Sequence, residues 1–443
     1  MTTTADPLRD LYQSLSGKGA EPLEPDHPYY VPILEGTPEK DPILMLWQRL
    51  DWSESESVNL LTGFRGNGKS TELRRLKQLL ETNSGAKVFL VNMLDFLLMT
   101  KPLELSDFVL SLMTALGQAV EQDTGLRALT HGYWERLQNF LTSEVQLNEF
   151  KLDFTPAKLG LKLKNEPDFK ERIQNHLRGH LSRLIEDAKN YVVDLVQAIR
   201  KEAGDPDLKV VLLVDSVEQI RGVGTEAQQV HESVVDLFSG QADKLAFKQL
   251  HLVYTVPPYL QILSPNQGRA LGGHPIVSWP NVHVRNRKGV PDAAGLEIME
   301  AIIDRRQAGW RDVIPSDTLR RLAVCTGGDL RDFFRLIREC AVTLSTARIA
   351  RPDANLDPEM VKRAEEQLRN ELLPLAADDA RWLARIHVAK DTGLETTDDL
   401  PDLARFLDGN LIMNYLNGEP WYDIHPLLLE EIKRHADDHR AEE

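Results

Sequence analysis

The stretch that decides the fold is GFRGNGKS, residues 63–70. It fits the pattern G-x-x-x-x-G-K-[ST], which binds phosphate when it connects a strand to a helix. An apolar run at residues 58–62 precedes it, and leucines recur at helical spacing across residues 70–81. The chain therefore predicts a strand, a glycine-rich loop and a helix in this order.

This loop provides the groups that a nucleotide triphosphate needs. Its glycines let backbone N–H groups surround the β-phosphate, and the following helix N-terminus adds partial positive charge. We expect Lys69 to reach the β- and γ-phosphates and Ser70 to hold Mg²⁺, so that ATP and Mg²⁺ are the cofactors. The expected nucleotide-binding residues are Gly63, Phe64, Arg65, Gly66, Asn67, Gly68, Lys69, Ser70 and Thr71.

Four more short apolar runs follow, separated by helical stretches. They lie at residues 88–91, 210–214, 250–256 and 276–284, and we expect the last strand to begin after Pro280. Short runs rich in Val and Leu that alternate with helices predict an α/β fold, with a parallel sheet covered on both faces.

An acidic residue follows the run at residues 210–214. Asp215 lies at the carboxyl end of its strand, where ligands of open α/β sheets bind, and we expect it to be the Mg²⁺-associated carboxylate. Position 216 is Ser rather than Glu, so the nearest acid, Glu218, is our candidate for the base that activates the attacking water. The alternative for Glu218 is a carboxylate that balances a helix dipole.

Two polar residues further along complete the candidate set. Thr255 lies near the end of the run at residues 250–256, where we expect its hydroxyl to contact the γ-phosphate or the attacking water, or to be a buried strand-end hydroxyl. Arg331 falls in the first turn of an expected helix. A cation is unfavourable there unless a phosphate or a nearby aspartate compensates its charge. The candidate catalytic residues are Lys69, Asp215, Glu218, Thr255 and Arg331.

Composition limits the class of protein. The 443 residues carry a formal charge of −16 with 42% hydrophobic residues, as expected for two or three globular units and not for a protein that coats nucleic acid. We see no membrane helix and no signal sequence, and expect a cytoplasmic protein. Two cysteines are too few for a disulfide framework.

Four domains are expected along the chain. An N-terminal arm spans residues 1–45, and a P-loop ATPase domain spans 46–287 with a helical and hairpin insert at about 100–205. A helical lid follows at 288–370. Helices and a hairpin around Asn417-Gly418 then suggest a winged-helix-like domain at 371–443.

The distribution of charged residues indicates which partners the last domain and the insert can bind. Residues 371–443 hold 7 Lys and Arg against 17 Asp and Glu, so we expect this domain to repel DNA and to pack on protein. In the insert, residues 158–164 alternate as in a strand, with Lys158, Lys162 and Lys164 on one face. This lysine face could bind nucleic acid or an acidic partner. We favour the alternative that it is a solvated strand edge.

These motifs together resemble the AAA+ superfamily, most closely its initiator-like and STAND-like branches, over about residues 40–430. The resemblance implies a Walker A motif at 63–70, Walker B at Asp215, sensor 1 at Thr255 and sensor 2 at Arg331. It also implies an additional strand between the Walker A and Walker B strands, with the Asp215 strand beside the Thr255 strand. Because Ser216 stands where most AAA+ enzymes carry Glu, hydrolysis should be slow.

The resemblance favours an ATP-controlled switch that assembles with a protein partner or with copies of itself, in a bacterial or archaeal defence or conflict system. A DNA-handling loader and a scaffold that does not hydrolyse its nucleotide are the alternatives. Members often complete the site with an arginine from a neighbouring subunit. Arg269, Arg285 and Arg287 are the candidates, although each is more often a solvated surface residue.

Overall fold

The computed structural model describes residues 6–34, 38–125, 134–138, 159, 162, 164–177, 179–222, 224–264, 266–417 and 419–442. By its contacts the chain divides into two compact units. The sheet unit comprises Glu39–Thr62 and Glu72–Ser278. The loop–lid unit comprises Met1–Pro38, Gly63–Thr71 and Trp279–Glu443, so the glycine-rich loop packs with the C-terminal part of the chain.

The sheet unit is built on five parallel strands in the order β2-β3-β4-β1-β5. The α/β prediction is confirmed, and so is the prediction that a strand lies between the Walker A strand and the Walker B strand. That strand is β4, which pairs with β1 and with β3. The bounds are β1 Ser57–Thr62, β2 Lys87–Asn92, β3 Val210–Asp215, β4 His251–Val256 and β5 Val277–Ser278.

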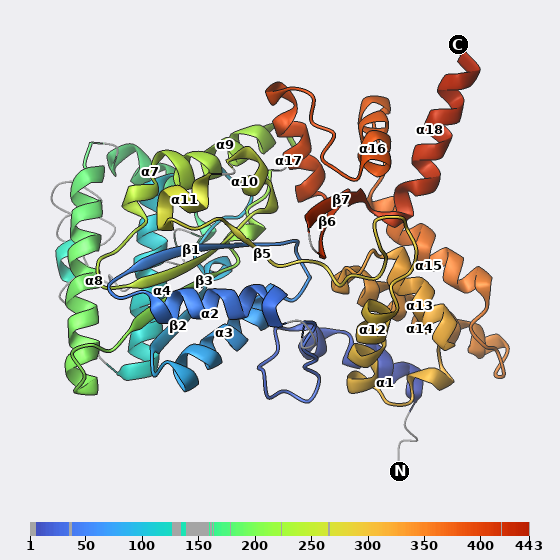
Figure 1. The fold of residues 1–443 in the computed structure, drawn as a ribbon, viewed down its shortest axis with the longest axis horizontal. Coiled ribbons are helices and arrows are strands. Elements are labelled where there is room, and N and C mark those ends of the chain that lie inside the picture. The colour runs from blue at the N-terminus through green and yellow to red at the C-terminus, as the bar shows by residue number, and fades with distance from the viewer. Residues whose placement is uncertain are drawn as a thin grey trace. The chain divides into compact units, whose positions relative to one another are not determined.

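Helices cover both faces of this sheet, as the all-buried strands β3 and β4 require. Figure 1 shows α2 and α3 on one side of the sheet and α9, α10 and α11 on the other. The helices are α2 Pro42–Trp52, α3 Lys69–Asn83, α4 Leu105–Thr124, α7 Pro167–Leu177, α8 Leu181–Ala203, α9 Ala227–Val235, α10 Pro258–Leu263 and α11 Gln267–Gly272. No helix in the described part of the chain is long and apolar enough to cross a membrane.

Two of the predicted strands are wrong in detail. Strand β5 ends before Pro280 rather than starting after it, because proline has no N–H to donate to a neighbouring strand. In the stretch predicted to alternate, Leu159, Lys162 and Lys164 have helical backbone, and Lys162 O accepts a hydrogen bond from the N–H four residues on. The leucines at 159 and 163 are four residues apart, a spacing that fits a helix equally well.

The other parts of that predicted hairpin, Lys158 and residues 150–154, lie outside the described residues. The helical part of the insert that ends at Ala203 consists of two helices, α7 and α8, which end and begin on either side of Gly179. Glycine favours this interruption because it weakens a helix interior by about 1 kcal/mol relative to alanine.

The loop–lid unit contains the predicted helical lid. Its core joins lid helices to the N-terminal arm, since Leu8, Leu11 and Leu15 pack in the same cluster as Trp310 and Phe333. Within residues 1–45, the predicted arm, helix α1, Pro7–Ser14, contacts α14. The lid helices are α12 Ala293–Arg306, α13 Ser316–Cys325, α14 Leu330–Ala350 and α15 Pro358–Glu371.

The C-terminal part has the predicted winged-helix arrangement. Strands β6 Ile412–Asn417 and β7 Glu419–Ile424 form an antiparallel hairpin in which Tyr415 pairs with Trp421, their rings stacked at 4.4 Å. Gly418, the expected turn residue, lies outside the described residues. The helices are α16 Ala377–Ala389, α17 Leu400–Asp408 and α18 Leu429–Glu442.

His251 predicts a pH dependence for the sheet unit. It is 1% exposed at the start of β4, and burial, helped by nearby Lys209 and Arg200, lowers its pKa to about 4 from 6.5. Because the folded pKa is lowered, the unfolded chain binds more protons below pH 6.5, so stability is fully present above that pH and is lost toward pH 4. We expect a loss of about 2 kcal/mol between pH 6.5 and 5.

Urea unfolding of the wild type and of His251→Gln at pH 7 and 5 measures this effect. The glutamine keeps a polar group for the Ser57 hydroxyl, which lies 3.0 Å from Nδ1 of His251, but cannot titrate. The variant should lose about 2 kcal/mol less than the wild type on acidification. Equal losses in the two proteins would contradict the assignment.

Candidate functional site

The loop between β1 and α3 is shaped by its glycines. Gly66 and Gly68 have φ of 83° and 91°, a region that other residues rarely adopt. Among the described residues, no acceptor takes a hydrogen bond from the N–H of Gly66 or Gly68. Such donors suit an anion, because phosphate oxygens only accept hydrogen bonds.

Lys69 is held inside this loop. It is only 3% exposed, and its Nζ donates to Gly63 O at 2.9 Å and to Phe64 O at 2.6 Å. Asn67 fixes the loop from the other side through two bonds with Trp279, Nδ2 to the backbone O at 3.1 Å and indole Nε1 to Asn67 O at 2.9 Å. Two backbone carbonyls therefore hold the ammonium within the loop.

Two of the predicted hydroxyl ligands lie at the start of α3. Ser70 is half-buried in its first turn. The hydroxyl of Thr71 accepts a hydrogen bond from the N–H of Leu23 at 3.0 Å, which ties the N-terminal segment to the loop. Ser70 is therefore a candidate Mg²⁺ ligand, whereas Thr71 has a positioning role in this structure.

The structure places Arg331 directly against the loop. A methyl group on Gly66 would come within 2.5 Å of the Arg331 Cβ and 2.8 Å of its Nε. Arg331 is the second residue of α14, whose N-cap, Asp329, accepts from the N–H of Asp332 at 2.9 Å. Burial, together with the Asp332 carboxylate, raises the pKa of Asp329. The predicted sensor 2 arginine and the predicted Walker A loop are thus neighbours within one unit.

The turn before Arg331 is fixed by the winged-helix hairpin. The hydroxyl of Tyr415, on β6, donates to Gly327 O at 2.9 Å. The carbonyl of Gly328 accepts from Val282 N at 3.3 Å, and the positive φ of both glycines favours these close approaches. The position of Arg331 therefore depends on β6.

A second contact joins the winged helix to the loop. Arg65 Nη2 forms an ion pair of 2.8 Å with Asp408, the last residue of α17, and the two side chains are 15% and 10% exposed. The sequence does not indicate this pair, because 343 residues separate its members and no motif links them. An arginine of the phosphate-binding loop thus has an acidic partner in the winged-helix domain.

In the sheet unit, Asp215 and Thr255 end neighbouring strands, as predicted. Thr255 is fully buried; its hydroxyl donates to Val214 O at 3.2 Å and accepts from Val217 N at 3.0 Å. It therefore holds the turn that carries Asp215, whose Oδ1 accepts from Ser216 N at 2.7 Å. These bonds make Thr255 a positioning residue in this structure.

Ser216 and Glu218, just after Asp215, bear on which carboxylate could act as the base. Ser216 is 2% exposed and has a left-handed backbone, with φ of 71°. Glu218 is 3% exposed and belongs to a 3₁₀ turn, Val217–Gln219. A buried carboxylate so close to the end of β3 remains a candidate base, displaced from the usual position by one turn of chain.

One candidate for the arginine supplied to a neighbouring subunit is wrong. Arg285 is 4% exposed and forms a 3.0 Å ion pair with Asp423 of β7, so it is a structural residue of the loop–lid unit. Sequence could not show this, because the partner is 138 positions away. Arg269 and Arg287 are exposed, as predicted for solvated arginines.

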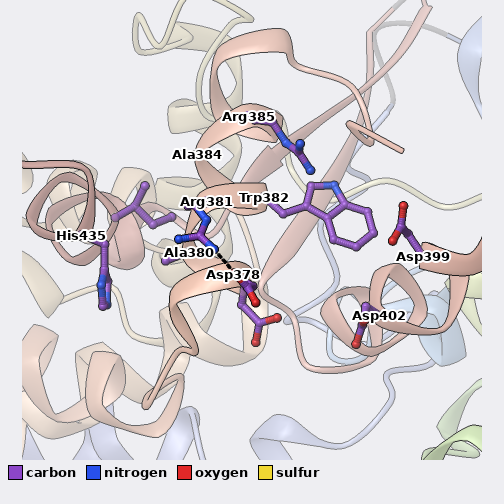
Figure 2. A pocket seen from close by; sticks show the side chains of 11 residues that line it. Asp378, Ala380, Arg381, Trp382, Ala384, Arg385, Asp399, Asp402 and His435 are labelled. Carbon is purple, nitrogen blue, oxygen red and sulfur yellow. Dashed lines mark hydrogen bonds and ion pairs between the residues drawn. The ribbon is translucent and has the colours of Figure 1, made fainter. Parts of the chain in front are cut away.

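A pocket of about 590 Å³ lies elsewhere, between α16, α17 and α18 (Figure 2). Trp382 forms part of its wall, and Asp378, Asp379, Asp399 and Asp402 line it. Three of these carboxylates pair with arginines: Asp378 with Arg381, and Asp379 and Asp402 with Arg405 at 2.7 Å and 3.2 Å. Asp399 instead accepts from the hydroxyl of Thr396 at 2.8 Å. Arg381 and Arg385 line the same pocket, and no residue of the glycine-rich loop, 63–70, is among its lining residues.

Comparison with known proteins gives distant structural likeness only. No protein-family model and no curated protein matches the sequence. The ORC2 protein of Aeropyrum pernix, in ADPNP–ADP complexes, aligns with a TM-score of 0.41 at 11% identity, covering 97% of this chain and 98% of that one. CDC6P of Pyrobaculum aerophilum aligns with a TM-score of 0.37 at 15% identity, covering 93% of this chain and 97% of that one.

A Walker-type ATPase of Pyrococcus abyssi aligns with a TM-score of 0.34 at 12% identity, covering 89% of this chain and 94% of that one. All three TM-scores are below 0.5. The chain is similar to these proteins, but its function has to be inferred from its own residues.

Proposed function

We propose that this protein is an ATP-binding switch of the AAA+ type, in which the nucleotide controls how the winged-helix domain packs on the phosphate-binding loop. One observation carries the proposal: the loop, the arginine against it and the winged-helix contacts all belong to the same compact unit. A ligand that binds this loop has to meet two side chains, Arg65 and Arg331, that the winged helix holds or positions.

The nucleotide part of the proposal rests on the loop geometry. The N–H groups of Gly66 and Gly68 and the ammonium of Lys69 present positive charge to one small region, and Arg331 lies against it. Bound Mg²⁺ would neutralise phosphate charge. We propose that Ser70 and Asp215, the predicted ligands, hold this ion together with phosphate oxygens and water.

We propose that hydrolysis is slow. Asp215 organises the ion, Thr255 fixes its turn, and Glu218 is the base that orients the attacking water. Ser216 puts no carboxylate next to Asp215, so the base has to act from three residues beyond β3. A bound nucleotide that never releases phosphate would favour the alternative, a scaffold that holds nucleotide as part of its structure.

Charge favours a protein rather than DNA as the partner of the winged helix. Helix α17, in the expected place of a recognition helix, carries Asp402 and Asp408 against Arg405, and Arg405 is already paired with carboxylates. Duplex affinity depends largely on phosphate contacts, which such a helix cannot make. We therefore propose that the switch acts on a protein partner or on a second copy of the chain.

The ion pair between Arg65 and Asp408 gives the test. If phosphates compete with Asp408 for Arg65, then Asp408→Asn should bind ATP about fivefold more tightly, because a pair this little exposed is worth about 1 kcal/mol. Amide hydrogen exchange in α17 and β6 should rise when ATP binds the wild type, and should be high in Asp408→Asn without nucleotide. Calorimetric titration and hydrogen exchange measure these two results.

Asp402→Asn is the matched control, since Asp402 lies on the same helix, is 59% exposed and pairs with Arg405 rather than with the loop. It should leave ATP affinity and exchange unchanged. The switch proposal is contradicted if ATP binds the wild type without changing exchange in the winged helix. Failure of the wild type to bind ATP would contradict nucleotide binding itself.

A further inference from the structure

Asn281 is a buried amide whose hydrogen bonds are missing. It is 2% exposed, and among the described residues neither Oδ1 nor Nδ2 has a hydrogen-bond partner. Leaving a buried donor or acceptor unsatisfied is unfavourable, and each such group in a folded protein calls for an explanation such as a ligand or an ordered water.

The position of Asn281 points to a ligand. It lies in a segment that is fixed at both ends beside the phosphate-binding loop. Two residues before it, Trp279 exchanges two hydrogen bonds with Asn67 of the loop. One residue after it, Val282 donates to Gly328, three residues before Arg331. Pro280 also restricts the backbone directly before Asn281.

The chemistry of the amide selects the part of the nucleotide. An asparagine side chain offers an acceptor oxygen and an NH₂ group with two donors. Phosphate oxygens only accept hydrogen bonds, so a phosphate would leave Oδ1 without a donor. An adenine edge can bond to both amide atoms at once, since its N6 amine donates to Oδ1 and a ring nitrogen accepts from Nδ2. Asparagine pairs with adenine in this way when proteins read DNA. Guanine presents two acceptors on the corresponding edge, and so fits the amide less well.

We propose that Asn281 binds the adenine base and makes the site prefer ATP to GTP. This inference rests on the proposed nucleotide binding and adds the base specificity, which the loop does not supply because its contacts are to phosphate. Asn281 is thus a specificity-determining residue, and its amide becomes satisfied when the base is bound.

The test is the affinity of Asn281→Leu and Asn281→Ala for ATP and for GTP, measured by titration beside the wild type. Leucine keeps the volume and removes the unsatisfied amide, so the variant should melt no lower than the wild type without nucleotide. We expect ATP affinity to fall about tenfold in both variants and GTP affinity to change less than about twofold. The preference for ATP should then largely disappear.

Asn59→Leu is the control. Asn59 lies in β1, is 3% exposed and also has no described partner for either amide atom, so its replacement removes the same chemical feature elsewhere. It should leave the ratio of ATP to GTP affinity unchanged. The inference is overturned if Asn281→Leu weakens both nucleotides equally or neither of them, as a buried water or a structural role would predict. If the wild type binds neither nucleotide, the proposed function fails together with it.

Discussion

Lys69→Ala is expected to weaken ATP binding by about 100-fold or more and to remove any phosphate release. The Lys69 ammonium is already buried within the loop, 2.9 Å from Gly63 O and 2.6 Å from Phe64 O. A buried cation forms charge-assisted hydrogen bonds to phosphate worth about 1.5–3 kcal/mol each, and alanine leaves none of them. Titration with ATP and a coupled phosphate assay measure the two losses.

Two further variants make this result specific. Lys69→Met keeps the length of the side chain without its charge and should behave like Lys69→Ala, which separates charge from packing. Lys77→Ala, on the same helix, removes a lysine that is 37% exposed and pairs only weakly with Glu81 at 3.7 Å. It should leave binding and turnover unchanged. Wild-type affinity in Lys69→Met would show that the loop does not bind phosphate.

The sequence predicted the sheet well because its signals are local. Each strand of the sheet unit except β5 is a run of five or six residues dominated by Val and Leu, and the run at β3 ends at Asp215. The glycine-rich loop is specified by its own eight residues, with positive φ at Gly66 and Gly68. The two errors, at β5 and around Lys162, fall where a proline or a short alternating pattern allowed two structures.

The surroundings of the loop were not predictable, because they depend on residues far apart in the chain. Nothing near Arg65 indicates Asp408, and nothing near Arg331 indicates that Tyr415 holds the turn before it. Asn281 is one polar residue in an apolar run, and only its burial without partners distinguishes it. Long-range packing, rather than any motif, thus decides which side chains meet at the candidate site.

The contacts of Asp423 were likewise not predictable from the sequence. We expect its substitution to cause a large loss of stability. Its side chain is 1% exposed; Oδ2 contacts Lys390 at 2.7 Å and Arg285 at 3.0 Å, and Oδ1 contacts His387 at 2.7 Å. Burial alone would raise the pKa of this carboxyl, but the bond with His387 and the charges of Arg285 and Lys390 outweigh it and lower the pKa.

Asp423→Ala should therefore destabilise the protein by about 3–5 kcal/mol, because it leaves Arg285 buried without its carboxylate. Urea unfolding at pH 7 measures this value. Asp378→Ala, in the same domain, removes a carboxylate that is 87% exposed and should cost less than about 0.5 kcal/mol.

The lowered pKa adds a pH dependence to this prediction. Since the folded pKa lies below the ordinary value of 3.8, the stabilisation by Asp423 is complete above pH 3.8 and is lost as the pH falls through the folded value. The cost of Asp423→Ala should therefore be constant from pH 7 to 5 and shrink only in stronger acid.

The double variant Arg285→Leu/Asp423→Leu tests the cause of this loss. It removes the buried charge together with its partner, so it should recover most of the stability lost in Asp423→Ala, as replacement of a buried ion pair by apolar residues often does. Lys390 and His387 keep contact with water, at 14% and 35% exposure, and need no buried partner. If the double variant is as unstable as Asp423→Ala, the loss comes from packing around the hairpin and not from the uncompensated Arg285 charge.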